Sequence, residues 1–159
     1  MTDFKALYDR HAGDIYRFAL FLSGNEADAK DITAETFARA LTGKSPLKTA
    51  TVKGYLLTIA RNLYLESLRK KGRMAAMPAG LQDKSPDPGQ QLHGKLELEA
   101  LMRFLQNFPE PDRAALLLRA DGVPYSEIAE NLNISLASAR VKVHRLRWKL
   151  TQWRASREQ

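Results

Sequence analysis

The chain has 159 residues, enough for one ordinary domain or two small ones, and its 44% hydrophobic content suffices for a globular core. A formal charge of +7 favours an anionic partner, although charge alone does not separate DNA from RNA or a membrane surface. The absence of cysteine excludes disulfides, thiolate zinc sites and cysteine nucleophiles.

The amino-terminal half begins with two amphipathic helices. Over residues 3–22 apolar side chains recur at helical spacing, and Ser23-Gly24 ends the pattern. Asn25 is a suitable cap for a second helix over residues 26–41, which turns Phe37 and other apolar side chains inward. Its other face carries Asp28, Asp31, Glu35 and Arg39. Such a face is usually only solvated, and the alternative is a surface that binds a partner.

A third helix over residues 52–71 follows a polar connector, in which Gly43 and Pro46 interrupt helical structure. It ends in the basic run Arg69, Lys70 and Lys71. The helix macrodipole favours cations there by about 0.3–1 kcal/mol, so the run alone does not establish phosphate contact. More informative is the mixture of stacking, hydrogen-bonding and cationic side chains, which suits single-stranded nucleic acid unless both tyrosines are core residues. These side chains are Tyr55, Arg61, Asn62 and Tyr64.

Residues 73–94 contain three prolines and three glycines without a helical period, which is typical of a linker between domains. A fourth helix begins near Lys95, and a fifth has Pro111 as its first residue and ends at Asp121-Gly122. The sequence therefore predicts an all-α fold. Two small helical domains, 1–72 and 95–159, are expected on either side of a flexible linker at 73–94.

The stretch 125–150 predicts a helix-turn-helix, in which a short helix, a tight turn and a longer basic helix follow one another. Ser126 is expected to cap the first helix, Asn133 to end it in the left-handed conformation, and Ser135 to cap the second. The second helix has a buried stripe of Leu136, Ala139, Val143, Leu146 and Leu150. Its remaining face carries Arg140, Lys142, Arg145, Arg147 and Lys149.

That basic face is either merely solvated or a DNA-binding surface. Residues 134–159 hold seven Lys/Arg against one acid, and this one-sided charge favours binding to DNA. The chain shows no Ser/His/Asp set, paired catalytic carboxylates, glycine-rich phosphate loop or metal-ligand spacing, so we expect no enzyme, cofactor or small-molecule substrate. It also shows no long apolar run and no signal-peptide pattern, which predicts a cytoplasmic protein without direct membrane insertion.

Three stretches, in this order, resemble the sigma-70 family of bacterial RNA polymerase sigma factors. DAKDITAETFARAL (28–41) resembles the region 2.2 helix, which docks on the clamp of the polymerase β′ subunit. KGYLLTIARNLYLESLRKKGR (53–73) resembles regions 2.3 and 2.4, which capture the −10 promoter element, and 105–150 resembles region 4, which reads the −35 element. The chain is similar to the extracytoplasmic-function (ECF) group, which keeps only regions 2 and 4.

The resemblance implies a role for individual residues. Asn62 would line a pocket for a flipped −10 base, and nearby cations would hold phosphates. The implied polymerase-docking surface is Asp28, Asp31, Glu35, Phe37 and Arg39. The implied −10 contacts are Ser45, Pro46, Leu47, Lys48, Tyr55, Arg61, Asn62, Arg69, Lys70 and Lys71. In region 4, the implied base readers are Arg140, Val141, His144 and Arg145, and the implied phosphate contacts are Ser126, Ser138, Lys142 and Arg147.

The implied partners are core RNA polymerase (β′ clamp and β flap), promoter DNA and an anti-sigma factor. Some positions depart from the family pattern and bear on docking strength and promoter sequence: Ala34, Tyr55, Asn133, Ala137 and Val141. Two rival hypotheses remain. One is a helix-turn-helix regulator that acts at an operator without polymerase, and the other is a sigma-like adaptor that binds only proteins.

Overall fold

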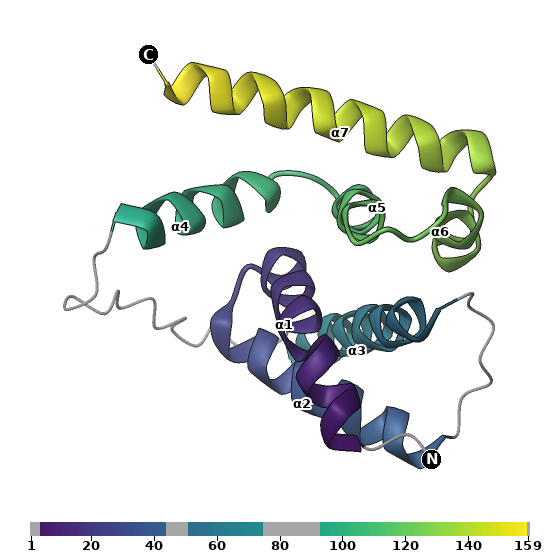
Figure 1. Ribbon diagram of the computed structural model, residues 1–159. Helices are drawn as coiled ribbons and strands as arrows, with labels where there is room; N and C mark the ends of the chain where they lie inside the picture. Colours follow the sequence, from purple (N-terminus) through teal and green to yellow (C-terminus); the bar gives the residue numbers. More distant parts are fainter. Residues whose placement is uncertain (1–3, 44–50, 75–92, 159) are drawn as a thin grey trace.

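The computed structural model describes residues 4–43, 51–74 and 93–158, and every helix or strand assigned in these ranges is an α-helix (Figure 1). The predicted all-α class is confirmed. None of the described helices is both long and apolar enough to span a bilayer. The elements are α1 (Phe4–Ser23), α2 (Glu26–Thr42), α3 (Val52–Met74), α4 (His93–Leu105), α5 (Glu110–Ala120), α6 (Tyr125–Leu132) and α7 (Leu136–Arg157).

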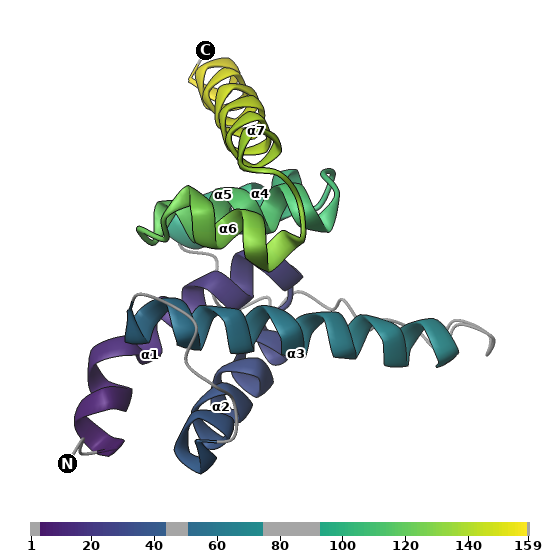
Figure 2. The same ribbon diagram turned by 90° about the vertical axis from the view of Figure 1, so that its right-hand side faces the viewer.

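Helices α1, α2 and α3 pack on one another and form the first half of the molecule (Figure 2). Their apolar stripes meet in a core that includes Phe18, Leu22 and Leu56, each with at most 1% of its surface exposed. Phe37 belongs to this core, because its ring lies edge-on to Tyr8 with the centroids 4.9 Å apart and is 1% exposed. Burying such a side chain contributes about 1.5–3 kcal/mol.

The ends of α2 follow the predicted capping chemistry. The Asn25 side chain accepts a hydrogen bond from the Asp28 amide at 2.9 Å, as expected of an N-cap. At the other end Gly43 adopts φ +63°, a left-handed conformation that glycine reaches without a steric cost. These two local signals fix the length of the helix that carries the acidic face.

The helices beside the expected linker are longer than predicted. Helix α3 continues through Gly72 to Met74, and α4 already begins at His93. A glycine inside a helix costs only about 1 kcal/mol, which the adjoining basic last turn partly offsets. The remainder of the expected linker, residues 75–92, lies outside the described ranges.

Helices α5, α6 and α7 pack together in the second half, around Ile128, Val143 and Leu146. Asn133 is left-handed with φ 56° and ψ 49°, and the Ser135 hydroxyl accepts from the Ser138 amide at 3.0 Å, as predicted. Two details were predicted wrongly. Helix α6 already begins at Tyr125 after Pro124, so Ser126 is not its cap, and Leu136 is 43% exposed instead of buried.

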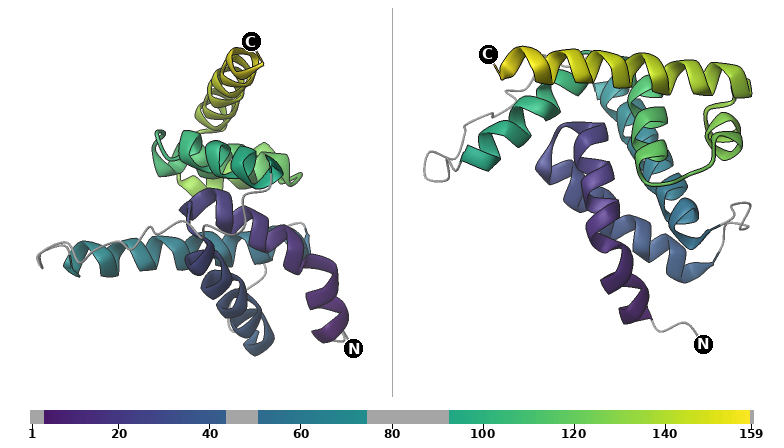
Figure 3. Two further views of the ribbon diagram at one scale, coloured as in Figure 1. Left: turned by 90° about the vertical axis from the view of Figure 1, so that its left-hand side faces the viewer. Right: turned by 45° about the horizontal axis from the view of Figure 1, so that its top comes forward.

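The two halves are in contact, and α7 lies on the far side of the second half from α1–α3 (Figures 1 and 3). Helix α1 packs against α4 and α5, and α3 packs against α5. This arrangement leaves the outer face of α7 exposed while the inner face of α3 is covered by the second half.

Candidate nucleic-acid and protein interfaces

The outer face of α7 presents its basic side chains to solvent. Ala139, Val143 and Leu146 fix the orientation of the helix by pointing into the core. The opposite side exposes Arg140, Val141, His144, Arg145 and Arg147. The structure thus brings the four expected base readers together on one continuous face, where a helix inserted into a major groove would meet base edges.

The expected phosphate contacts around this face differ in their availability. Ser126 and Ser138 are exposed, and the Ser138 hydroxyl accepts from the hydroxyl of Ser135 at 3.0 Å. Lys142 is half-buried and donates to Asp112 of α5 at 2.8 Å, so its ammonium group is already paired within the protein. Lys142 would have to exchange a carboxylate for a phosphate in order to contact DNA.

Tyr125 and Arg119 are part of the same face, although sequence reasoning did not assign either of them. The guanidinium carbon of Arg119 lies 4.6 Å from the centre of the Tyr125 ring, and that of Arg140 lies 5.6 Å from it. The His144 ring stacks on the same tyrosine at 6.4 Å. Tyr125 therefore holds two of the expected base readers in place. The available signal was its position as an aromatic first residue of the shorter helix.

The exposed face of α2 keeps its acidic character. Asp31 and Glu35 are exposed, while Arg39 bonds to Glu35 at 3.4 Å and to Glu66 of α3 at 3.2 Å. Asp28 is half-buried and accepts from Lys71 at 3.0 Å. The expected placement of Phe37 on this surface is corrected, because its ring lies in the core and supports the helix from behind.

The nucleic-acid candidates on α3 fall into exposed and buried groups. Asn62, Arg69 and Lys70 are exposed, and Lys71 is exposed but paired with Asp28. Tyr55 and Tyr64 are 8% and 5% exposed, which favours the core interpretation of both rings over base stacking. The connector candidates Ser45, Pro46, Leu47 and Lys48 lie outside the described residues.

Arg61 occupies an unexpected position, because it is buried between the two halves. Its guanidinium donates twice to the carboxylate of Glu110, at 2.8 Å each, and once to the Asn131 carbonyl at 3.0 Å. The side chain of Arg61 is 8% exposed and that of Glu110 is 12% exposed. Arg61 is therefore not part of an open DNA-binding surface in this structure, contrary to the expectation from sequence.

A second charged contact joins the halves at the start of α3. Lys53 lies 3.2 Å from Asp14 of α1 and 3.3 Å from Asp121, which follows α5. Burial raises the pKa of Asp121 despite the nearby ammonium group. Burial would also raise the pKa of Asp14, but Lys53 and Arg17 outweigh it and lower that pKa. Burial would lower the pKa of Lys53, but both carboxylates together raise it.

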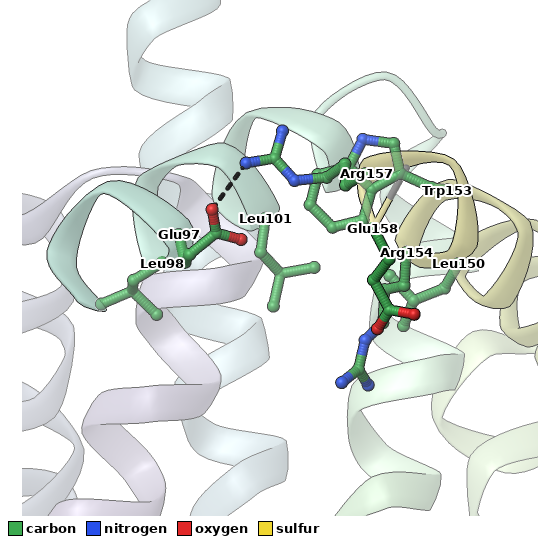
Figure 4. A pocket seen from close by; sticks show the side chains of 8 residues that line it. All are labelled: Glu97, Leu98, Leu101, Leu150, Trp153, Arg154, Arg157 and Glu158. Atoms are coloured by element: carbon green, nitrogen blue, oxygen red, sulfur yellow. Dashed lines mark hydrogen bonds and ion pairs between the residues drawn. The ribbon is translucent and has the colours of Figure 1, made fainter. Parts of the chain in front are cut away.

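A groove of about 600 Å³ runs between α4 and the end of α7 (Figure 4). Leu98, Leu101 and Leu150 contribute apolar walls, and Arg157 donates to Glu97 across it at 2.8 Å. The Trp153 ring, which also lines the groove, stacks on Phe104 at 4.7 Å. Within the described ranges, no group of three or more histidines and carboxylates is arranged to hold a metal ion.

Comparison with known proteins assigns these two halves. The Sigma-70 region 2 family model matches residues 7–74, and the Sigma-70 region 4 family model matches residues 98–150. The ECF RNA polymerase sigma factor EcfG of Rhodopseudomonas palustris is 33% identical over 84% of this chain and 75% of its own length. The chain belongs to the ECF sigma factors. The first half of the molecule is thus sigma region 2 and the second half is region 4.

Other relatives of this sigma factor agree. The ECF sigma factor SigE of Mycolicibacterium smegmatis is 34% identical over 98% of the chain, which spans 63% of the length of that relative. SigM of Bacillus subtilis is 28% identical over 91% of the chain and 90% of its own length. The sigma factor RpoE of Bartonella quintana, solved with the anti-sigma factor NepR, has the same fold, with a TM-score of 0.77, 24% identity and 96% coverage of both chains. Proteins of this family bind core RNA polymerase and promoter DNA and act in transcription initiation.

Proposed function

We propose that this sigma factor directs core RNA polymerase to its promoters, reading the −35 element as duplex and holding the −10 element as a single strand. The supporting observation is that one chain exposes both an acidic α2 face and a basic outer α7 face. The first suits docking on a protein and the second suits a major groove. The polymerase performs the chemistry, and the sigma factor supplies position and specificity. Its site of action would be the bacterial nucleoid.

In region 4, Arg140 and Arg145 would donate to base edges, a geometry in which arginine favours guanine. Val141 would offer an apolar contact, such as one to a thymine methyl group, where a polar residue is common in the family. Ser126, Ser138, Lys142 and Arg147 would contact phosphates, which position the helix without reading sequence. Tyr125 would keep Arg140 and His144 in register through the ring contacts described above.

In region 2, Asn62 would hydrogen-bond a base that has left the duplex. Its exposed position is consistent with this role, because its neighbours Arg61 and Leu63 are both buried and leave the amide free to face a strand. Arg69 and Lys70 would hold the phosphates that follow, since both extend into solvent at the end of α3. The family resemblance adds the connector residues Ser45, Pro46, Leu47 and Lys48, which lie outside the described residues, to the proposed −10 contacts.

The proposed polymerase contact is the exposed part of α2, around Asp31 and Glu35. Reversing both charges in Asp31→Lys/Glu35→Lys should weaken binding to core RNA polymerase by about 10-fold to 100-fold. The two new lysines would face a polymerase surface that, in this proposal, carries positive charge to complement the native carboxylates. Asp9→Lys/Glu130→Lys makes the same charge change at two other exposed positions and should leave binding within about twofold. Surface plasmon resonance on immobilised core polymerase measures both. Equal affinities for the two double variants would remove α2 from the interface.

The rival hypotheses lack a supporting observation. A regulator that acts only at an operator has no need for an exposed acidic α2 beside a −10-type α3, and the family match covers both regions. We propose in addition that an anti-sigma factor restrains this protein, as NepR binds the Bartonella quintana sigma factor. A free protein with a charge of +7 and a docking surface would otherwise engage polymerase continuously.

A further inference from the structure

Two buried arginines, one from each region, cross the boundary between region 2 and region 4. Arg61 of α3 reaches into region 4, and Arg113 of α5 reaches into region 2. They are 7% and 5% exposed. Arginine is almost never buried without partners, so each must find its hydrogen bonds at the boundary.

Arg61 binds two kinds of acceptor in region 4. Its paired bonds to the Glu110 carboxylate have the bidentate geometry that makes an arginine–carboxylate contact strong and directional. Its third bond goes to the Asn131 carbonyl in the last turn of α6, where the helix macrodipole is negative. The Asn131 side chain in turn donates to the Thr58 hydroxyl of α3 at 2.9 Å.

Arg113 mirrors this arrangement in the opposite direction. It donates to the Leu22 carbonyl in the last turn of α1 at 2.9 Å and 3.1 Å, and to the Tyr64 hydroxyl of α3 at 3.1 Å. Gln106 adds bonds to the Phe21 and Leu22 carbonyls at 3.3 Å and 3.2 Å. Each region therefore caps the carboxyl end of a helix in the other region with a buried arginine.

This closed arrangement hides some of the proposed functional surfaces and exposes others. The outer face of α7, Asn62 and the acidic face of α2 are exposed. Arg61, which belongs to the helix that would capture the −10 strand, is occupied by Glu110. The free protein can thus present its −35 reader while its −10 helix is partly covered.

Promoter geometry requires the two regions to separate. Positions −35 and −10 differ by about 25 base pairs, which span about 85 Å of B-form DNA. A compact body of 159 residues has a radius of gyration of about 15 Å. If region 4 reads −35 while region 2 holds −10, as proposed above, the bonds of Arg61 and Arg113 across the boundary must break.

We propose that Glu110 and Arg113 form a latch that holds the free sigma factor closed, and that Glu110 competes with promoter DNA for Arg61. This inference rests on the proposed function. The latch suits release, because a buried ion pair loses much of its attraction to desolvation and a DNA phosphate offers arginine an equivalent bidentate partner. Removal of Glu110 leaves the Arg61 charge buried without a counter-ion, which favours the open state.

The absence of native cysteine allows two spin labels to be placed uniquely, at Asp9→Cys on α1 and Gln152→Cys on α7, both exposed. Double electron–electron resonance on the full chain should give one narrow distance distribution in the otherwise unchanged protein. Glu110→Lys should lower the closed fraction at least fivefold, and Glu110→Gln should give an intermediate shift. Glu130→Lys, the same charge change at an exposed position of α6, should have no effect. A distribution for Glu110→Lys that matches Glu130→Lys, at equal helix content by circular dichroism, would overturn the latch.

A reversible lock tests whether closure inhibits. The side chains of Thr58 and Asn131 touch across the boundary, so a short bis-methanethiosulfonate reagent should bridge the thiols of Thr58→Cys/Asn131→Cys in the closed protein. The bridged protein should have at least tenfold lower run-off transcription with core polymerase and should recover its activity on reduction. Failure of the reagent to bridge the pair, or full activity of the bridged protein, would contradict the inference. Absence of run-off from the cysteine-free protein would instead count against the proposed function, while the spin-label result would still decide the latch.

Discussion

Replacing Arg140 and Arg145 together by alanine is expected to lower the affinity for the −35 duplex by at least about 30-fold, with little change in stability. Both guanidinium groups lie on the exposed outer face of α7, so their removal opens no cavity. Each bidentate contact to a base contributes about 1–3 kcal/mol of discrimination, so two contacts together correspond to about 30-fold to 10⁴-fold. Fluorescence anisotropy measures the change in affinity. The duplex used is one that has been selected from a random library by binding to the unaltered protein.

The control for this prediction is Arg103→Ala/Arg154→Ala, which removes the same charge from two exposed positions outside the α7 reading face. Its effect should stay within a few-fold and should vanish as salt screens the lost charge. If Arg140 and Arg145 read bases, replacing both by alanine should weaken binding to random duplex much less than binding to the selected duplex. Equal losses on both duplexes would show that Arg140 and Arg145 contact only phosphates.

Replacing Asn62 by alanine is expected to impair promoter opening while duplex binding stays within about twofold. The amide is exposed on α3 and can pair with a base only after that base has left the helix stack. Loss of its hydrogen bonds to the flipped base should reduce the open complex by about 10-fold. Permanganate reactivity of unpaired thymines reports opening, and a gel shift of the holoenzyme on duplex reports binding.

Asn107→Ala is the matched control for Asn62, since it removes an exposed amide from the turn after α4. It should leave both permanganate reactivity and the gel shift unchanged. A loss of duplex binding in Asn62→Ala that equals the loss of opening would contradict a role for Asn62 in strand capture.

The local signals of the sequence predicted the elements of the fold well. Asn25, Asn133 and Ser135 mark helix ends because each acts through hydrogen bonds or backbone conformations within a few residues. Phe37 is instructive, because its helical spacing placed it in the core whereas the family resemblance placed it on the docking surface. The structure agrees with the spacing. Helical periodicity predicts directly which side chains are buried. The family resemblance assigns a whole motif to docking and does not separate buried supporting residues from exposed contact residues.

The contact between the regions was not predictable from local patterns. Glu110 lies 49 residues beyond Arg61, and Asn131 lies 70 residues beyond it. Each of these side chains looks like an ordinary surface residue of its own helix, and only the packing of α3 against region 4 turns them into buried partners. Tyr125 was missed for a related reason, because its role depends on Arg119 and His144 converging from two other helices.

The central claim is that this protein confers promoter-specific initiation on core RNA polymerase, and transcription of the source genome in vitro tests it most directly. Core polymerase freed of other sigma factors is incubated with genomic DNA with and without the protein, and the 5′ ends of the transcripts are mapped. We predict discrete start sites that require the protein and share sequence blocks near −35 and −10. Tight binding to duplex DNA without any new start site would contradict the account.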